Sequence, residues 1–257
     1  MKKLLFFDID GTLYDNVNDN IPESTVEALE LLKANPNVEI AIATGRSSFI
    51  LNKVEAIMHY FDAFVFLNGL HIVYKGEDVF AYYPDKQDIS KLINSFKESN
   101  LIHGCFNKDY EYISKITKAI ELDFASVNLD LPLVTEICDV PNVMQLYFFG
   151  KKEELDFIQT QNPQFRIVPW HTNGADVLPL EISKDAGIKL LAKKLGYDME
   201  NVMAFGDAPN DLEMIVSAGV GVAMGNATDQ VKESANYVTS NVDKDGLYKA
   251  LKHFKLI

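Results

Sequence analysis

The sequence predicts an α/β protein in which a doubly wound parallel sheet is interrupted by a second domain. Short apolar runs of strand length alternate with amphipathic helical segments near the N-terminus and again from residue 183 onward. Such alternation is typical of βαβ units and a parallel sheet. Between these parts the order of elements becomes irregular, which indicates an inserted α+β domain. We therefore expect a core formed by residues 1–83 and 181–257 and an inserted domain over 84–180.

Apolar runs and turn residues place the elements of the first core segment. Pro22 and Glu23 favour a helix start, because proline and acids are common in the first turn of a helix. Lys75–Asp78 separates two alternating runs, which indicates a hairpin. The expected elements are strands over 4–10, 38–43 and 64–67, helices over 22–32 and 47–59, and a hairpin over 71–83.

The later elements follow from the same patterns. In the inserted domain we expect a helix, paired short strands and a second helix, then strands over 143–149 and 165–168 with a helix over 152–159 between them. In the returning core we expect a helix over 183–195, a strand over 202–205, a helix from 210, and strands over 219–223 and 237–239.

Composition and charge narrow the class of protein. Of the 257 residues, 47% are hydrophobic and 24% charged, as in ordinary globular proteins. The apolar stretch after the N-terminal lysines is broken at Asp8, which argues against a signal peptide, and the longest apolar runs are too short for a membrane span. Cys105 and Cys138 have neither metal-ligand nor disulfide spacing. We therefore expect a cytoplasmic protein, either a monomer or a small homo-oligomer.

The negative net charge restricts the kinds of partner that the protein is expected to bind. A formal charge of -13 disfavours nucleic acids and anionic membranes, which such a protein repels at long range. An anionic substrate would need a local cation to attract it.

Two carboxylates follow the first apolar run, in the stretch Leu5–Leu13 that reads LFFDIDGTL. In a strand, Asp8 and Asp10 would share one face, at the sheet edge where open α/β folds bind ligands. Like charges this close raise one of the two pKa values. One acid could then act as an ionised nucleophile and the other could carry a proton. An acidic turn with no chemistry would have the same local sequence.

Three later motifs decide between these interpretations. Thr44-Gly45-Arg46 ends the second apolar run, where a hydroxyl, a glycine amide and a helix beginning at Ser47 would form a phosphate cradle. Lys184 begins a predicted helix, although a solvated surface lysine would fit the same position. Asp207 follows a further strand and suits a hard cation, although an acid there could simply cap the next helix. All four motifs fall on one predicted edge of the sheet, and four coincidences are improbable.

These motifs resemble the signatures of the haloacid dehalogenase (HAD) superfamily, and specifically its Cof-type sugar-phosphatase-like branch. The matching stretches are Asp8–Thr12, Thr44–Arg46, Lys184 and Gly206–Asp211. The resemblance implies a Rossmann-like core, a C2-type α/β cap domain over 84–180, Mg²⁺ as cofactor, and phosphoryl transfer through an aspartyl-phosphate. One departure is Asp185, which stands where the family commonly has glycine.

The resemblance also implies catalytic and metal-binding roles. Asp8 would be the nucleophile, ionised at neutral pH if its pKa is near the unperturbed value of ~3.9. Asp10 would be the general acid and then the general base. Mg²⁺ would be held by the side chains of Asp8 and Asp207 and by the main-chain carbonyl of Asp10. With Asp10 protonated, Asp8, Asp207 and Asp211 contribute -3 to the site and Lys184 contributes +1. A divalent cation neutralises the remaining charge of -2.

The resemblance assigns the phosphoryl oxygens to another group of residues. These are Thr44, Gly45, Lys184 and Asn210. Asp211 would orient either a metal-bound water or Lys184, and Arg46 would either contact the phosphate or brace its loop.

Substrate recognition is the least determined part of the site. The stretch PWHTNGADVLPLEI contains His171, Asn173 and Asp176, which we interpret as candidates for binding substrate hydroxyls. A plain polar turn would fit this stretch as well.

We therefore expect a Mg²⁺-dependent phosphatase for small phosphorylated metabolites, with sugar phosphates as the favoured substrates. Phosphatases of cofactor phosphates such as flavin mononucleotide or pyridoxal phosphate, and a phosphomutase or phosphotransferase, are alternatives. A phospho-accepting signalling receiver also uses clustered aspartates, but it has no need of an inserted domain. A catalytically silent binding protein would not need the intact set of acids.

Overall fold

The computed structural model describes residues 2–126, 129–171 and 173–257. The chain forms two compact units. The first contains residues up to Arg46, Leu51–Phe80 and Ser183–Ile257, and the second contains Ser47–Ile50 and Ala81–Ile182. The insertion is thus flanked on both sides by segments of the same core, which we call the core unit. The second unit is called the inserted unit.

An eight-stranded sheet forms the centre of the core unit, in the order β14-β13-β12-β1-β2-β3-β4-β5. The strands from β14 to β3 pair in parallel, and β4 pairs with β3 in antiparallel fashion. The strands are β1 Lys3–Phe7, β2 Val38–Ala43, β3 Ala63–Phe66, β4 His71–Tyr74, β5 Glu77–Ala81, β12 Val202–Gly206, β13 Val220–Ala223 and β14 Tyr237–Val238. This order confirms the predicted parallel α/β core.

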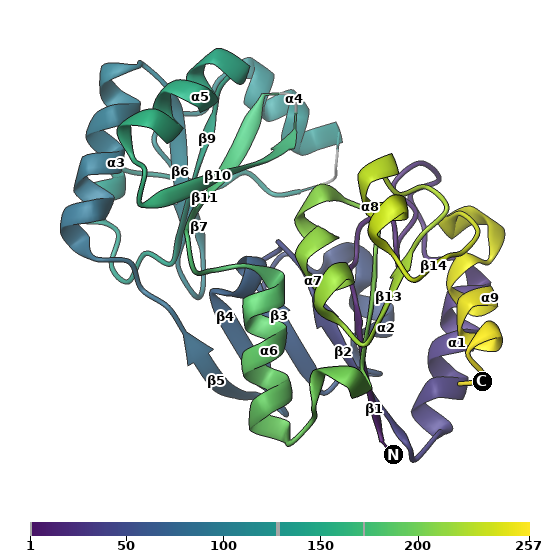
Figure 1. Cartoon of the computed structure of the whole chain (residues 1–257). Coiled ribbons are helices and arrows are strands. Elements are labelled where there is room, and N and C mark those ends of the chain that lie inside the picture. Colours follow the sequence, from purple (N-terminus) through teal and green to yellow (C-terminus); the bar gives the residue numbers. More distant parts are fainter. Residues whose placement is uncertain (1, 127–128, 172) are drawn as a thin grey trace. The chain divides into compact units, whose positions relative to one another are not determined.

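Helices cover both faces of this sheet (Figure 1). Leu5 and Phe7 of β1 pack into an apolar core shared with α1 and α9, whereas Leu4 and Phe6 face a second core shared with α6 and α7. This alternation is why the strand is an almost unbroken apolar run. The helices are α1 Glu23–Ala34, α2 Glu55–Met58, α6 Lys184–Leu195, α7 Leu212–Ser217, α8 Asp229–Ser234 and α9 Gly246–His253.

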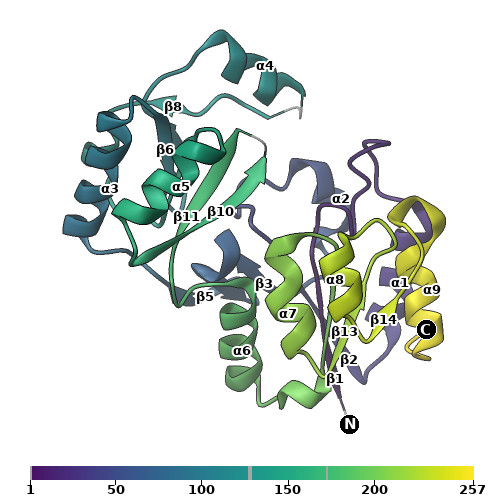
Figure 2. The same cartoon turned by 45° about the horizontal axis from the view of Figure 1, so that its top comes forward.

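The inserted unit has a sheet of its own, with the helices α3 and α5 beside it (Figure 2). This sheet has six strands, in the order β10-β11-β9-β6-β7-β8. Its strands are β6 Ile102–Phe106, β7 Glu111–Ile113, β8 Leu133–Val134, β9 Gln145–Phe149, β10 Phe165–His171 and β11 Gly174–Pro179. Its helices are α3 Lys86–Glu98, α4 Lys118–Ser126 and α5 Lys152–Gln161. An apolar core between the sheet and the helices α3 and α5 includes Phe96, Phe148 and Ile158. This mixture of elements confirms the expected α+β pattern.

Two predicted elements of the core unit are wrong in their extent. The first strand ends at Phe7, so Asp8 and Asp10 lie beyond it. The helix expected from Ser47 is absent over most of its length: only a 3₁₀ turn at Asn52–Val54 and the four-residue α2 are helical. The predicted hairpin at Lys75 is confirmed, and Lys75 and Gly76 have the positive φ angles, 50° and 80°, that a tight hairpin turn requires.

The alternative of a plain polar turn for the stretch PWHTNGADVLPLEI is wrong for most of its length. In this stretch β10 continues to His171, and β11 covers Gly174–Pro179. Within the described part of the chain, the helices are too short and too polar to cross a membrane.

Candidate active site

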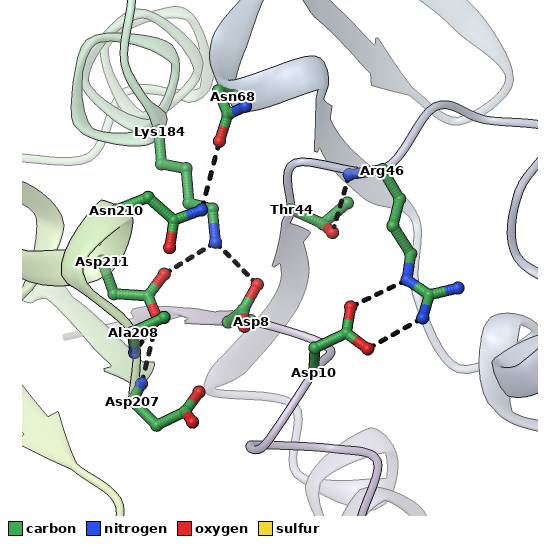
Figure 3. Close-up of polar contacts among 10 residues, drawn as sticks. All are labelled: Asp8, Asp10, Thr44, Arg46, Asn68, Lys184, Asp207, Ala208, Asn210 and Asp211. Carbon is green, nitrogen blue, oxygen red and sulfur yellow. Dashed lines mark hydrogen bonds and ion pairs between the residues drawn. The ribbon is translucent and has the colours of Figure 1, made fainter. Parts of the chain in front are cut away.

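The predicted site residues lie where the parallel strands of the core unit end. Asp8 follows β1 directly, Thr44 follows β2, and Asp207 follows β12. Lys184 is the first residue of α6, whose N-cap Ser183 accepts a hydrogen bond from the amide of Ala186. Because carboxyl ends of parallel strands meet at one edge of a sheet, these side chains gather in one place (Figure 3).

A buried lysine joins two buried carboxylates at the centre of this site. Lys184 Nζ donates to Asp8 Oδ1 and to Asp211 Oδ1, each at 2.7 Å. Lys184 is 2% exposed, Asp8 4% and Asp211 fully buried. Burial alone would lower the pKa of Lys184, but Asp211 and Asp8 outweigh it and the pKa is raised. Lys184 is therefore a buried cation, and the alternative of a solvated surface lysine is wrong.

Asp211 connects this lysine to the loop that carries Asp207. Its Oδ2 accepts hydrogen bonds from the amides of Asp207 at 2.9 Å and Ala208 at 3.0 Å, while its Oδ1 is bound to Lys184. Both oxygens thus have strong donors. Of the two roles expected for Asp211, the geometry matches the orientation of Lys184.

Asp10 is paired with Arg46 and not with Asp8. The guanidinium binds the carboxylate with two hydrogen bonds, Nε to Oδ2 and Nη2 to Oδ1, both at 2.8 Å. The predicted arrangement of Asp8 and Asp10 on one face of a strand is wrong, because β1 ends before either residue. Arg46 therefore fixes the carboxylate of Asp10, a contact that the sequence did not indicate.

Thr44 and Gly45 form a turn without the expected helix. Thr44 is buried, and its Oγ accepts a hydrogen bond from the amide of Arg46 at 3.1 Å. Since no helix starts at Ser47, a helix dipole does not contribute to anion binding at this turn. The groups present at this turn are main-chain groups, the threonine hydroxyl and the neighbouring Asn68.

Asn68 is a residue of the site that the sequence reasoning missed. Its Oδ1 accepts a hydrogen bond from Asn210 Nδ2 at 3.3 Å, and its amide donates to Thr44 O at 3.0 Å. Leu67, Asn68 and Gly69 have positive φ angles of 49°, 53° and 106°. Such conformations are costly for residues with side chains and concentrate at functional sites. The Asn-Gly pair directly after an apolar run was the signal that could have revealed this loop.

Asp207 offers the clearest indication of a site that could hold a cation. Its Oδ1 is buried and has no hydrogen-bond partner among the described residues, while Oδ2 accepts from Asn226 Nδ2 at 3.1 Å. Within the described chain, Asp8, Asp207 and Asp211 each present a carboxylate oxygen within 4.8 Å of the others. Because Asp211 already binds three donors, Asp8 and Asp207 are the acids best placed to hold Mg²⁺, a cation that prefers oxygen ligands.

Glycine is required opposite this carboxylate. Gly11 has φ +78°, and a Cβ built on it would lie 2.2 Å from Asp207 Oδ2. Asn226 Nδ2 also donates to the carbonyl of Gly11 at 2.8 Å, which ties the two segments together. Asn226 is a second residue that the motifs alone did not indicate.

Two acids of the site, Asp8 and Asp207, have raised pKa values. Burial is the main cause for Asp8, followed by the negative charge of Asp211; Lys184 opposes both, and Asp10 is the smallest contribution. Burial, followed by Asp211, raises the pKa of Asp207 to about 7. The expectation of an unperturbed Asp8 is therefore wrong. At both residues burial and the charge of Asp211 outweigh Lys184, and a divalent cation would lower both pKa values.

The unusual Asp185 has a structural explanation. Its carboxylate binds Lys189 at 2.6 Å, one turn along α6, and also accepts a hydrogen bond from Ser217 of α7. These contacts attach α6 to α7, so the acid acts within the scaffold.

The three candidates for substrate specificity lie in the inserted unit. Asp176 belongs to β11 and pairs with Tyr147 of β9, and Asn173 is exposed in the turn before β11. The backbone of His171 pairs with Gly174, and its side chain lies outside the described residues. The core-unit site described above does not include them.

Comparisons with known proteins now identify the family. The profile of the haloacid dehalogenase-like hydrolases matches residues 5–251. The chain is 34% identical over 259 residues to the putative phosphatase YkrA of Bacillus subtilis (strain 168), covering 99% of this chain and 98% of that protein. It is 26% identical over 266 residues to the 5-amino-6-(5-phospho-D-ribitylamino)uracil phosphatase YitU of the same organism, covering 98% and 97%.

A solved structure agrees with these relatives. The HAD subclass IIB sugar phosphatase BT4131 matches with a TM-score of 0.93 at 29% identity, over 100% of each chain. The family profile and the structural match each extend over nearly the whole chain, including the insertion. The chain therefore belongs to the haloacid dehalogenase superfamily, as a phosphatase of its Cof-type branch.

Proposed function

We propose that this protein is a Mg²⁺-dependent phosphatase that hydrolyses small phosphate monoesters, with sugar phosphates preferred, through an aspartyl-phosphate on Asp8. The observation that carries the proposal is the buried cluster in which Lys184 links Asp8 to Asp211, next to the unpartnered Oδ1 of Asp207. A buried lysine and an orphaned carboxylate oxygen at one sheet edge are suited to a phosphate and a cation.

Asp8 is the proposed nucleophile. Its carboxylate oxygen attacks phosphorus, the bond from phosphorus to the ester oxygen breaks, and the departing alkoxide takes a proton from Asp10. Water then attacks the phosphorus of the aspartyl-phosphate and gives up a proton to Asp10, so that inorganic phosphate leaves and Asp8 is restored. The hydrogen bond from Lys184 holds Asp8 in a fixed position throughout.

Asp10 has to leave Arg46 during this cycle. The two hydrogen bonds from the guanidinium hold both oxygens of the carboxylate. Donation of a proton to the leaving group requires that this pair loosens. Arg46 therefore orients Asp10.

The other residues of the site bind the phosphoryl oxygens and the cation. Thr44, Gly45, Lys184 and Asn210 bind the phosphoryl oxygens, and Asn68 holds Asn210 in place. Asp8, Asp207 and the carbonyl of Asp10 would hold Mg²⁺, which supplies positive charge for the phosphoryl group when bound. Four carboxylates and two cations, Lys184 and Arg46, otherwise leave the site with a formal charge of -2 and would repel a phosphate dianion.

A phosphate-release screen tests this function. Purified protein with Mg²⁺ is expected to release phosphate from a panel of sugar phosphates without any acceptor, and chelation by EDTA or the substitution Asp8→Asn should abolish release. Full activity in EDTA would overturn the mechanism. Transfer of the phosphoryl group only in the presence of a sugar acceptor would identify a phosphomutase or phosphotransferase instead.

The similarity to YitU favours a second candidate substrate. That relative is a 5-amino-6-(5-phospho-D-ribitylamino)uracil phosphatase and aligns with nearly the whole chain. Its substrate carries its phosphate on a ribityl chain, which is an alditol. This compound, together with flavin mononucleotide and pyridoxal phosphate, belongs in the panel, and a clear preference for one of them would replace sugar phosphates as the proposed substrates.

A further inference from the structure

Three loops lie in a row at the edge of the core sheet that carries the site. The strand order β14-β13-β12 places β13 in the middle, and the three strands are parallel. The loop after β12 carries Asp207, and the loop after β14, residues 239–246, leads into α9. We call this second segment the C-terminal turn. The loop after β13, residues 224–228, therefore lies between the proposed metal site and the C-terminal turn.

The main chain attaches the middle loop to both of its neighbours. On one side, the amide of Thr228 donates to the carbonyl of Asp207 at 3.0 Å. On the other side, the amide of Gly225 donates to the carbonyl of Ser240 at 3.0 Å. A Cβ on Gly225 would lie 2.6 Å from the carbonyl carbon of Ser240, so the two loops approach too closely for any other residue. The side chain that follows, that of Asn226, is thus held at a defined place between the two loops.

Asn226 bridges the same two neighbours with its side chain. Its Nδ2 donates to Asp207 Oδ2 at 3.1 Å and to the carbonyl of Gly11 at 2.8 Å. Its Oδ1 accepts a hydrogen bond from the amide of Val242, in the C-terminal turn, at 2.9 Å. The main-chain partners fix which way the amide points, because a carbonyl can only accept and an N–H group can only donate. We call these three hydrogen bonds the Asn226 bridge.

The Asn226 bridge determines which oxygen of Asp207 is available to a cation. Asn226 occupies Oδ2, whereas Oδ1 is buried and has no hydrogen-bond partner among the described residues. An asparagine amide is a neutral donor, so it holds the carboxylate without cancelling the negative charge that attracts a cation. A lysine or arginine in its place would supply the very charge that the cation has to supply.

We propose that Asn226 is a positioning residue for the cation: it holds the Asp207 carboxylate with Oδ1 toward the cation and links cation binding to the C-terminal turn. This inference rests on the Mg²⁺ site of the function proposed above. Removal of a hydrogen bond that orients a metal ligand typically weakens metal binding about 10- to 100-fold. Since coupling between two sites is reciprocal, a bound cation should also keep the C-terminal turn closed.

Titration calorimetry of Mg²⁺ into the full-length protein, without substrate, measures the affinity. Asn226→Leu keeps the shape of the side chain and removes its donors and its acceptor, so the Kd for Mg²⁺ should rise about tenfold or more. The matched control is Asn236→Leu. Asn236 is also exposed, and its Oδ1 accepts from the amide of Gly221 at 2.7 Å, near the opposite ends of the parallel strands. The control should keep the wild-type Kd.

Hydrogen exchange tests the link to the C-terminal turn. In the wild type, saturating Mg²⁺ should slow exchange of the amides over residues 239–246, that of Val242 included, about tenfold. By reciprocity, this is the factor by which the Asn226 bridge strengthens Mg²⁺ binding. In Asn226→Leu, saturating Mg²⁺ should leave these rates unchanged. A residue that only filled space in the loop would alter the exchange rates without altering their response to Mg²⁺.

Failure of this role is distinguishable from failure of the proposed function. Wild-type protein that binds no Mg²⁺ would refute the proposed Mg²⁺ site itself. Wild-type protein that binds Mg²⁺, combined with an unchanged Kd in Asn226→Leu, would refute the role of Asn226 alone. Exchange that Mg²⁺ does not slow in the wild type would refute the link to the C-terminal turn.

A second variant keeps the test decisive if Asn226→Leu does not fold. Asn226→Ser suits a polar loop, but its side chain is one bond shorter and has one donor hydrogen in place of two. It should therefore raise the Kd for Mg²⁺ by about the same factor of ten. A wild-type Kd in Asn226→Ser would overturn the inference.

Discussion

A comparison of Gly11→Ala with Gly196→Ala distinguishes the cost of backbone strain from damage to the proposed metal site. Gly11 has φ +78°, and the new Cβ would lie 2.2 Å from Asp207 Oδ2 and 2.6 Å from its Cγ. Gly196, at the C-terminal cap of α6, has φ +79° and no atom within 4 Å of its added Cβ. The two glycines thus have the same backbone conformation, and only one of them lies against the carboxylate.

The magnitudes follow from these two environments. Alanine in the left-handed region costs about 1–2 kcal/mol, so both variants should lose that much stability. For a protein of this size the loss corresponds to a fall in melting temperature of roughly 2–8 °C. Only Gly11→Ala should also displace the Asp207 carboxylate, because a separation of 2.2 Å is far shorter than any van der Waals contact.

The assay is the Mg²⁺ dependence of phosphate release at saturating substrate. Gly196→Ala should have the wild-type Mg²⁺ concentration for half-maximal activity. Gly11→Ala should need at least tenfold more Mg²⁺, which is the effect of about 1.4 kcal/mol in binding. Equal Mg²⁺ dependence in the two variants would refute the placement of the cation beside Asp207.

Three further predictions concern the charges of the site. Lys184→Met should destabilise the protein by about 3–5 kcal/mol near neutral pH, because two carboxylates would remain buried without their cation. Its matched control on the same helix, Lys189→Met, should cost under about 1 kcal/mol, and calorimetry that finds similar losses for both would contradict the buried cluster. The raised pKa of Asp207, about 7, means that the folded metal-free protein binds a proton more tightly than the unfolded chain does, so its stability should fall as pH rises from about 4 to 7. Mg²⁺ should therefore raise the melting temperature more at pH 8 than at pH 5.5, and the same increase at both pH values would count against Asp207 as a ligand. Arg46→Gln should lower kcat about tenfold or more, since Asp10 loses both hydrogen bonds that orient it. Arg46→Lys, which keeps the charge without the two parallel bonds, should give an intermediate kcat, and wild-type rates across the pH profile of both variants would exclude this role.

Local sequence patterns were sufficient for much of the fold. The strand over 38–43 has the predicted bounds, and the alternation of apolar strands with amphipathic helices predicted the doubly wound sheet. The helix expected from Ser47 is absent, and Ser47–Ile50 belongs to the inserted unit. The ring of Phe49 lies 6.4 Å from that of Phe106, a contact between residues distant in sequence that a local pattern could not indicate. The same limit explains β11, which is held as a strand by pairing with β9 and β10.

For the site, local motifs identified the residues but not the contacts between residues that are distant in sequence. The motifs identified Asp8, Lys184 and Asp211 as separate candidates. They could not show that Lys184 is buried, because its partners lie 176 and 27 residues away along the chain. The pairing of Asp10 with Arg46 also depended on where β1 ends, and a strand boundary is the least certain feature of a sequence pattern.

Asp8 is the residue proposed to accept the phosphoryl group, and trapping the covalent intermediate tests this assignment. Protein mixed with Mg²⁺ and a sugar phosphate that the release screen finds to be hydrolysed would be quenched in acid within milliseconds and reduced with borohydride. Reduction of an aspartyl-phosphate converts that aspartate into homoserine, which peptide mass spectrometry can locate. We expect homoserine at residue 8, and none at that position in Asp8→Asn. Turnover without a modified residue 8, or with the modification at Asp10, Asp207 or Asp211, would contradict the assignment of Asp8 as the nucleophile.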